Sequence, residues 1–246
     1  MWEPDQAPRL ARRCLKDLGR RWQHVEGVGR LADQLVADVG LPEDVRAAAW
    51  LHDIGYAPDL ALTGFHPLDG AVYLSECGAP EEVVGLVAWH TGAVWEASER
   101  GLSDRLARMP EPSEKWLDVV TLIDLVTGPD GVATTPDRRV AEILGRYDSS
   151  HPVHRAVKFS GPELLASAAR ARAALGLSDE WPLGSTERMS EAAGPSPARG
   201  GAGCDPSGHD QGGCRRDLLR GLVAAGGRGG VLARSAPAGP STRCFV

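Results

Sequence analysis

Apolar side chains recur at intervals of three and four residues through most of the chain up to residue 177, a pattern that predicts α-helices. The stretches with this spacing are residues 9–39, 42–53, 67–77, 80–90, 113–126, 135–146 and 160–176. No stretch alternates convincingly between apolar and polar positions. The sequence therefore predicts an all-α fold, a bundle of about seven helices.

Glycine and proline mark the expected boundaries of these helices. Gly40 is expected to end the first helix, and Pro162 is expected in the first turn of the last one. Residues 56–65 lack the helical spacing and are expected to form a loop. Residues 96–112 are charged and irregular, which favours a flap or a long loop.

The composition changes after residue 184. Residues 185–246 contain 13 Gly and 5 Pro, no Trp, no Tyr and a single Phe. Gly and Pro at this density without a repeat period are typical of disordered segments. We therefore expect one functional domain over residues 1–184, followed by a disordered Gly/Pro/Arg-rich tail over residues 185–246.

The acidic balance of the expected domain narrows the choice of partners. The whole chain carries a net charge of −6, but the tail holds eight Arg, no Lys and five acidic residues, which leaves −9 for residues 1–184. A groove for a nucleic acid duplex would need a basic face, so none is expected. An acidic domain can still bind phosphate groups if metal ions supply the positive charge.

The sequence shows no membrane or export signal. No apolar run comes near the roughly 20 residues that span a bilayer. The N-terminus, Met1-Trp2-Glu3-Pro4-Asp5, lacks the basic start and the apolar stretch of a signal peptide. We therefore expect a cytoplasmic protein with no membrane partner.

Side chains that commonly bind metals gather around one short stretch, Leu51-His52-Asp53-Ile54-Gly55, at the end of an apolar helical run. Each of the others lies in or beside a different predicted helix, as metal sites in helical bundles require. The six candidate ligands are His24, His52, Asp53, His66, His90 and Asp124. Asp124 stands in an apolar stripe one turn beyond Val120, and a buried carboxylate must be paired or bound to a metal.

Imidazole and carboxylate ligands together suit one or two divalent metal ions such as Fe, Mn, Co, Ni or Zn. The expected ligands are His24, His52, Asp53 and Asp124 for one ion and His66 and His90 for a second, with Asp53 bridging. Two ions about 3.5–4 Å apart can clamp a phosphoryl group and generate a bound hydroxide near neutral pH. The predicted function is therefore hydrolysis of a phosphate ester or anhydride, with His52 and Asp53 as catalytic residues.

This ordered set resembles the HD-domain superfamily of metal-dependent phosphohydrolases. The resemblance rests on His24, His52-Asp53-Ile54-Gly55 and Asp124, and it covers about residues 20–130. It implies that residues 1–184 form an HD-type domain whose partner is a small phosphorylated molecule, preferably a nucleotide. The resemblance further implies that a metal-bound hydroxide cleaves the ester or anhydride bond.

The added His66 and His90 look like the subset of this superfamily that binds two metals. The bacterial hydrolases of symmetrical dinucleoside polyphosphates are one such group. Residues 125–129, however, lack the acidic, arginine-containing segment expected of that group, so its substrate is not carried over. Tyr56 stands where many members of the superfamily have Lys, which removes a possible phosphate contact.

Other interpretations of the same residues stay open. A few HD-domain proteins with a similar ligand set use a di-iron centre to activate oxygen, and a non-catalytic domain that senses a nucleotide is a further alternative. The histidines taken singly could be packed or helix-terminal residues. Arg20 and Arg21 could touch phosphate or, as the favoured interpretation, form a solvated face. Tyr56, Asp69 and Thr91 lie near the expected site, where a structural role is favoured for each.

Overall fold

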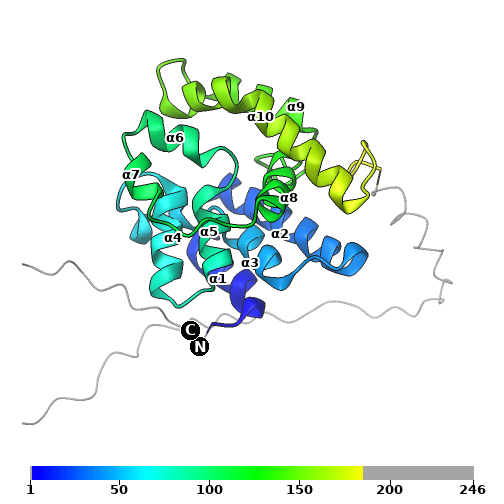
Figure 1. The fold of residues 1–246 in the computed structure, drawn as a ribbon, viewed down its shortest axis with the longest axis horizontal. Helices are drawn as coiled ribbons and strands as arrows, with labels where there is room; N and C mark the ends of the chain where they lie inside the picture. The colour runs from blue at the N-terminus through cyan, green and yellow to red at the C-terminus, as the bar shows by residue number, and fades with distance from the viewer. Residues whose placement is uncertain (1, 185–246) are drawn as a thin grey trace, which may run out of the picture. The chain divides into compact units, whose positions relative to one another are not determined.

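Helices form the regular structure of residues 2–184, the part of the chain that the computed structural model describes (Figure 1). In chain order the α-helices and the short 3-10 helices (η) are η1 (Pro4–Gln6), α1 (Ala7–Leu15), α2 (Arg20–Val39), α3 (Glu43–Leu51), η2 (Ile54–Tyr56), η3 (Pro58–Leu60), α4 (His66–Glu76), α5 (Glu81–Trp89), α6 (Ala93–Glu99), α7 (Ser103–Leu106), α8 (Glu114–Leu125), α9 (Pro136–Arg146) and α10 (Pro152–Leu175). The all-α prediction is confirmed, with ten α-helices in the described residues where about seven were expected. None of these helices is long and apolar enough to cross a membrane. The expected tail, residues 185–246, lies outside the described residues.

The first expected helix is two helices in the structure. A single helix over residues 9–39 is wrong, because α1 ends at Leu15 and α2 begins at Arg20. Gly19 turns the chain between them with φ at +54°, a backbone conformation that favours glycine. α2 ends where expected, at Gly40, whose left-handed φ of +69° closes the helix.

The second half of the described chain is more helical than expected. Residues 96–112, expected as a loop, contain the end of α6 and all of α7. α10 begins at Pro152, well before the expected start, so that Pro162 lies inside it. Pro162 removes one backbone hydrogen bond, but α10 packs along α8 and α6, and this tertiary packing outweighs the local preference.

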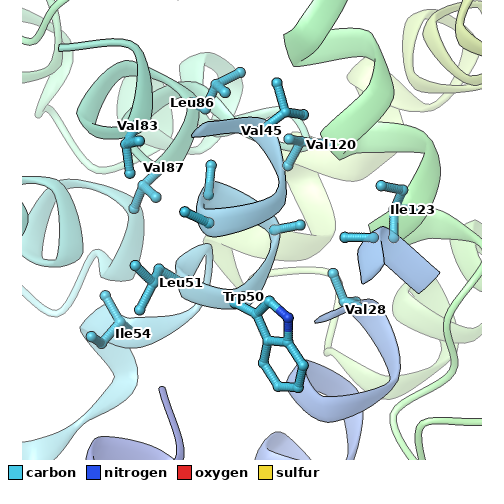
Figure 2. Packing of buried hydrophobic residues seen from close by; sticks show 14 of the residues in the cluster. Val28, Val45, Trp50, Leu51, Ile54, Val83, Leu86, Val87, Val120 and Ile123 are labelled. Atoms are coloured by element: carbon cyan, nitrogen blue, oxygen red, sulfur yellow. The ribbon is translucent and has the colours of Figure 1, made fainter. Parts of the chain in front are cut away.

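Helix α3 is at the centre of the packing. It contacts α1, α2, α5 and α8, and its three consecutive alanines are fully buried, which lets the neighbouring helices approach closely. Figure 2 shows apolar side chains from α2 (Val28), α5 (Val83, Leu86, Val87) and α8 (Val120, Ile123) around this helix. The C-terminal end of α3 therefore lies inside the bundle, where Leu51, His52 and Asp53 are at most 2% exposed.

Gly29 of α2 allows the close contact with α3. It faces the indole ring of Trp50, and a Cβ added at this position would overlap that ring. Gly29→Ala is therefore expected to lower the free energy of unfolding by about 1–3 kcal/mol, as overpacking of a core does. Urea unfolding followed by tryptophan fluorescence measures the change.

The matched control for this substitution is Gly145→Ala in α9, because open space surrounds the Cβ that it would add. Alanine favours a helix over glycine by about 1 kcal/mol, so the control is expected to be as stable as the wild type or slightly more stable. If Gly29→Ala were as stable as this control, the tight packing of Trp50 on α2 would be wrong.

Candidate metal centre

The structure brings the six expected side chains together, most of them from helix ends. His52 and Asp53 directly follow α3, and His90 directly follows α5. His66 is the first residue of α4, Asp124 lies in the last turn of α8, and His24 lies in the second turn of α2. Adjacent residues within a helix point about 100° apart. Because the chain leaves the helix at His52, that ring and the next carboxylate can face one centre.

One half of the site consists of His24, His52 and Asp53, each at most 2% exposed. The Nε2 atom of His24 lies 3.3 Å from Nε2 of His52 and 3.8 Å from Oδ2 of Asp53. Nε2 of His52 lies 3.3 Å from the same carboxylate oxygen. Asp124 adds its Oδ1 at 3.0 Å from Nε2 of His24. These four donors, three of them in direct contact with His24, are the group expected around the first ion.

The other half consists of Asp53, His66 and His90. Nε2 of His66 and Nε2 of His90 lie 3.3 Å apart, and Oδ1 of Asp53 lies 3.1 Å from Nε2 of His66. Asp53 therefore turns one carboxylate oxygen to each half of the site. A carboxylate in this position has the geometry to bridge two metal ions.

Backbone carbonyls orient three of the histidine rings. The Nδ1 atoms of His24, His52 and His90 lie 3.1, 2.8 and 2.7 Å from the carbonyl oxygens of Gly128, Ala49 and Val87, respectively. A carbonyl oxygen only accepts hydrogen bonds, so each Nδ1 carries the hydrogen and, in the neutral ring, Nε2 keeps its lone pair. The Nε2 atoms of His24 and His52 face each other, as do those of His66 and His90, and a cation between them would stabilise this arrangement. The donor set thus fits divalent metal ions.

Burial keeps two of the histidines neutral. Together with the neighbouring His52 and His66, it lowers the pKa of His90 to about 3. It also lowers the pKa of His24, although the Asp124 carboxylate acts in the opposite direction. Neutral imidazole is the form that binds metal ions, so these two side chains need lose no proton when an ion binds.

The carboxylates remain charged despite their burial. Burial alone would raise the pKa of Asp53, but Arg21 and then His52 outweigh it and hold that pKa well below its usual range. At Asp124, His24 likewise outweighs burial and lowers the pKa. Burial opposes protonation of His52, but Asp53 outweighs this effect and raises the pKa of the ring. His52 is therefore the side chain from which a metal ion must displace a proton.

Arg21 and Tyr56 form one wall of the site. Arg21 forms an ion pair with Oδ2 of Asp53, and its guanidinium lies 3.9 Å from the centre of the Tyr56 ring. The Tyr56 ring stacks on His66, with the ring centres 4.0 Å apart. The favoured interpretation of a solvated face is therefore wrong for Arg21, whereas Arg20 is exposed.

Two residues near the site fix the start of α4, from which His66 projects. The buried Asp69 carboxylate accepts hydrogen bonds from the backbone N–H and the hydroxyl of Thr63, which ties down the loop before the helix. Gly55 lies so close to α4 that a Cβ there would overlap the backbone carbonyl of His66. Asp69 thus has the structural role that was favoured for it, and Gly55 contributes by having no side chain.

Thr91 lines the cavity next to His90 and is unusual in two respects. Its φ of +37° is rare for a residue with a branched Cβ, and its buried hydroxyl has no hydrogen-bond partner within residues 2–184. Backbone strain and an unused hydroxyl are common at functional sites. The structural role favoured for Thr91 therefore does not account for these two features.

Two arginines outside the expected set also face the site. Arg139 and Arg146 of α9 line the cavity over the cluster, together with Ile143. Their spacing of four and three residues places all three on one face of the helix. This spacing is the feature of the sequence that could have indicated the position of the two arginines, because it aligns both with an apolar residue on the inward face of the helix.

The fold and the site together define an all-helical protein whose His/Asp cluster can hold divalent metal ions. Residues 21–127 match the family model of the HD domain. The match includes all six side chains of the cluster and agrees with the resemblance expected over about residues 20–130. No curated protein and no solved structure matches the chain.

Metal binding is expected to weaken as the pH falls. The raised pKa of His52 means that the ring takes up a proton as the solution becomes more acidic, and a metal ion must then displace it. The affinity is expected to fall by up to about tenfold per pH unit for each proton released. Calorimetric titration with Mn²⁺ at about pH 6 and about pH 8, in two buffers with different heats of ionisation, measures both the affinity and the protons released. Equal affinity at the two pH values with no proton release would contradict this expectation.

Proposed function

We propose that this chain is a metal-dependent phosphohydrolase that cleaves a phosphate ester or anhydride of a nucleotide or another small phosphorylated metabolite. The observation that carries the proposal is the position of Asp53, whose two carboxylate oxygens face two groups of histidines. A shared carboxylate suits a pair of metal ions, and two-metal sites of this kind catalyse displacement at phosphorus. The HD domain at residues 21–127 supports hydrolysis, because that family consists generally of metal-dependent hydrolases.

The proposal assigns the six side chains to two ions. One ion would be held by His24, His52, Asp53 and Asp124, and the other by Asp53, His66 and His90. Fe, Mn, Co, Ni and Zn all suit this mixture of nitrogen and oxygen donors. When bound, such ions would supply positive charge to a phosphoryl group and a water molecule that ionises near neutral pH. The hydrogen bonds from Nδ1 to backbone carbonyls hold the rings in place beforehand, which supports a pre-organised site.

Both polar and apolar side chains line the cavity over the cluster. The polar ones include Arg21, Thr91 and Arg139, and the apolar and aromatic ones include Tyr56, Ile143, Tyr147, Val153, Val157 and Leu164. The polar groups suit a phosphate group, and the apolar groups suit the organic part of the substrate, such as a nucleoside. His52 and Asp53 are the proposed catalytic residues, because Asp53 belongs to both groups of ligands and the His52 ring lies beside His90, with the ring centres 5.2 Å apart.

The proposal is tested by replacing the shared ligand. Asp53→Asn keeps the shape of the side chain but loses its charge. It is expected to reduce the bound metal and to lower kcat/KM by on the order of 100-fold or more on whichever phosphate compound the wild type hydrolyses best. Elemental analysis of the full-length protein gives the metal content. An assay of released phosphate or nucleotide over a panel of esters and anhydrides gives the activity.

Asp59→Asn is the matched control for this substitution. Asp59 is exposed and does not line the cavity over the cluster, so the variant is expected to keep its metal and its activity. Circular dichroism checks that Asp53→Asn is folded. Metal-loaded wild-type protein that releases no product from any member of the panel would overturn the proposal. Oxygen consumption by the iron-loaded protein would then indicate an oxygenase, and nucleotide binding without turnover would indicate a sensing domain.

A further inference from the structure

A second cavity adjoins the metal centre on the side of α2 and α9. Its volume is about 180 Å³. The residues that line it are Arg20, Arg21, His24, Pro129, Arg139 and Arg146. Three of its arginines also line the cavity over the cluster, so these side chains are common to the linings of the two neighbouring cavities. His24 connects the second cavity to the candidate metal ligands.

Arg139 is the most deeply buried arginine of this arginine-lined cavity. Its side chain is only 6% exposed, and its Nη1 donates to Oε2 of Glu142 at 2.6 Å. Its Nε is also buried but has no hydrogen-bond partner within the described part of the chain. A buried guanidinium with an unused donor costs free energy unless an acceptor completes its shell. Because Arg139 lines both cavities and has an unused donor, it favours an anionic ligand beside its guanidinium.

The charges around the cavity also favour an anion. Arg146 donates to both carboxylate oxygens of Glu142, at 2.6 to 2.8 Å, so that one carboxylate serves two arginines. Arg20 has no ion pair with any residue of the described range 2–184 and adds a third positive charge. An excess of two positive charges thus stands beside the metal centre, in a part of the chain (residues 1–184) whose net charge is −9.

We propose that the arginine-lined cavity binds a second phosphate group of the substrate, so that the substrate is a di- or polyphosphate and not a simple monophosphate ester. This inference rests on the proposed function of the metal centre, which would receive the phosphoryl group to be cleaved. Guanidinium groups bind phosphate oxygens in a bidentate manner. Arg139 and Arg146 face the cavity from α9, and Arg20 faces it from α2. Nucleoside diphosphates, longer nucleotides and inorganic pyrophosphate share the required chemistry.

The test uses ligands that the protein cannot hydrolyse. Full-length, metal-loaded protein is titrated with methylenediphosphonate and with methylphosphonate, and the binding heats give both affinities. The wild type is expected to bind the diphosphonate at least about tenfold more tightly, which corresponds to one or two charge-assisted hydrogen bonds. Arg146→Gln is expected to lose most of this preference, because its affinity for the diphosphonate falls more than its affinity for methylphosphonate.

Arg138→Gln is the matched control, because Arg138 is the exposed neighbour of Arg139 on α9 and lines neither cavity. It is expected to bind both ligands as the wild type does. Arg139→Lys is a second variant that keeps the charge but loses the planar fork, and it is also expected to reduce the preference for the diphosphonate. Unchanged diphosphonate affinity in both Arg146→Gln and Arg139→Lys would overturn the inference, because the metal ions alone would then account for the binding.

A kinetic comparison separates this inference from the proposed function. The wild type and Arg146→Gln are assayed for kcat/KM on the nucleoside monophosphate and the diphosphate of one nucleoside. If wild type and variant cleave both compounds equally well, the result supports the proposed hydrolase and contradicts the second phosphate site. If neither compound is cleaved but diphosphonate binding still depends on Arg146, the result supports the second phosphate site and contradicts the proposed hydrolase.

Discussion

The buried carboxylate of Asp53 constrains the whole site, because its charge must be matched where water does not reach it. One of its oxygens meets Arg21 and His52, and the other meets His66. An isolated charge at this depth would cost several kcal/mol. Segments far apart in the sequence, namely the first turn of α2, the end of α3 and the start of α4, therefore have to meet at this point. The apolar packing around α3 holds these segments in contact.

The same local arrangement occurs at the ends of two ligand-bearing helices, α3 and α5. His52 follows the last residue of α3 and His90 follows the last residue of α5. In each case Nδ1–H donates to the carbonyl three residues earlier, on Ala49 or on Val87. Carbonyls in the last turn of a helix have no partner within the helix, so these rings satisfy an acceptor that would otherwise be buried and unpaired. The bond that stabilises the helix end is thus the bond that directs Nε2 into the site, which links folding to chemistry in one side chain.

Local sequence carries much of this structure, and the exceptions have physical causes. The helical spacing and the boundary residues predicted α3, α4, α5, α8 and α9 close to their observed ends, because each helix buries a regular apolar stripe. The break at Gly19 was missed because one glycine within a periodic stretch is compatible with an unbroken helix. Pro162 misplaced the start of α10, because packing on α8 and α6 outweighs the local cost of proline.

The sequence likewise indicates some residues of the candidate site and not others. His52 and Asp53 stand out in the sequence because two ligand types are adjacent at the end of an apolar run. Arg139 and Arg146 do not, because arginine on a helix is usually solvated. Only the arrangement of α9 over the cluster places both in the cavity lining, where Arg139 is buried and Arg146 stays exposed. The exposure of a cation thus depends on tertiary packing, whereas a ligand set can be recognised by its order along the chain.

At Tyr56, a neighbouring side chain supplies the positive charge that tyrosine itself cannot carry. The sequence predicts the loss of a cationic phosphate contact there, but the guanidinium of Arg21 lies on the Tyr56 ring and lines the same cavity. Burial would lower the pKa of Arg21, but Asp53 outweighs it and raises that pKa, so the cation persists. Arg21 and a metal ion at Oδ2 of Asp53 would compete for the same oxygen. A metal ion there would take over part of the carboxylate charge, which would leave more of the Arg21 charge available to an anion in the cavity. The proposed binding of metal and of anion would therefore favour each other at this point of the structure.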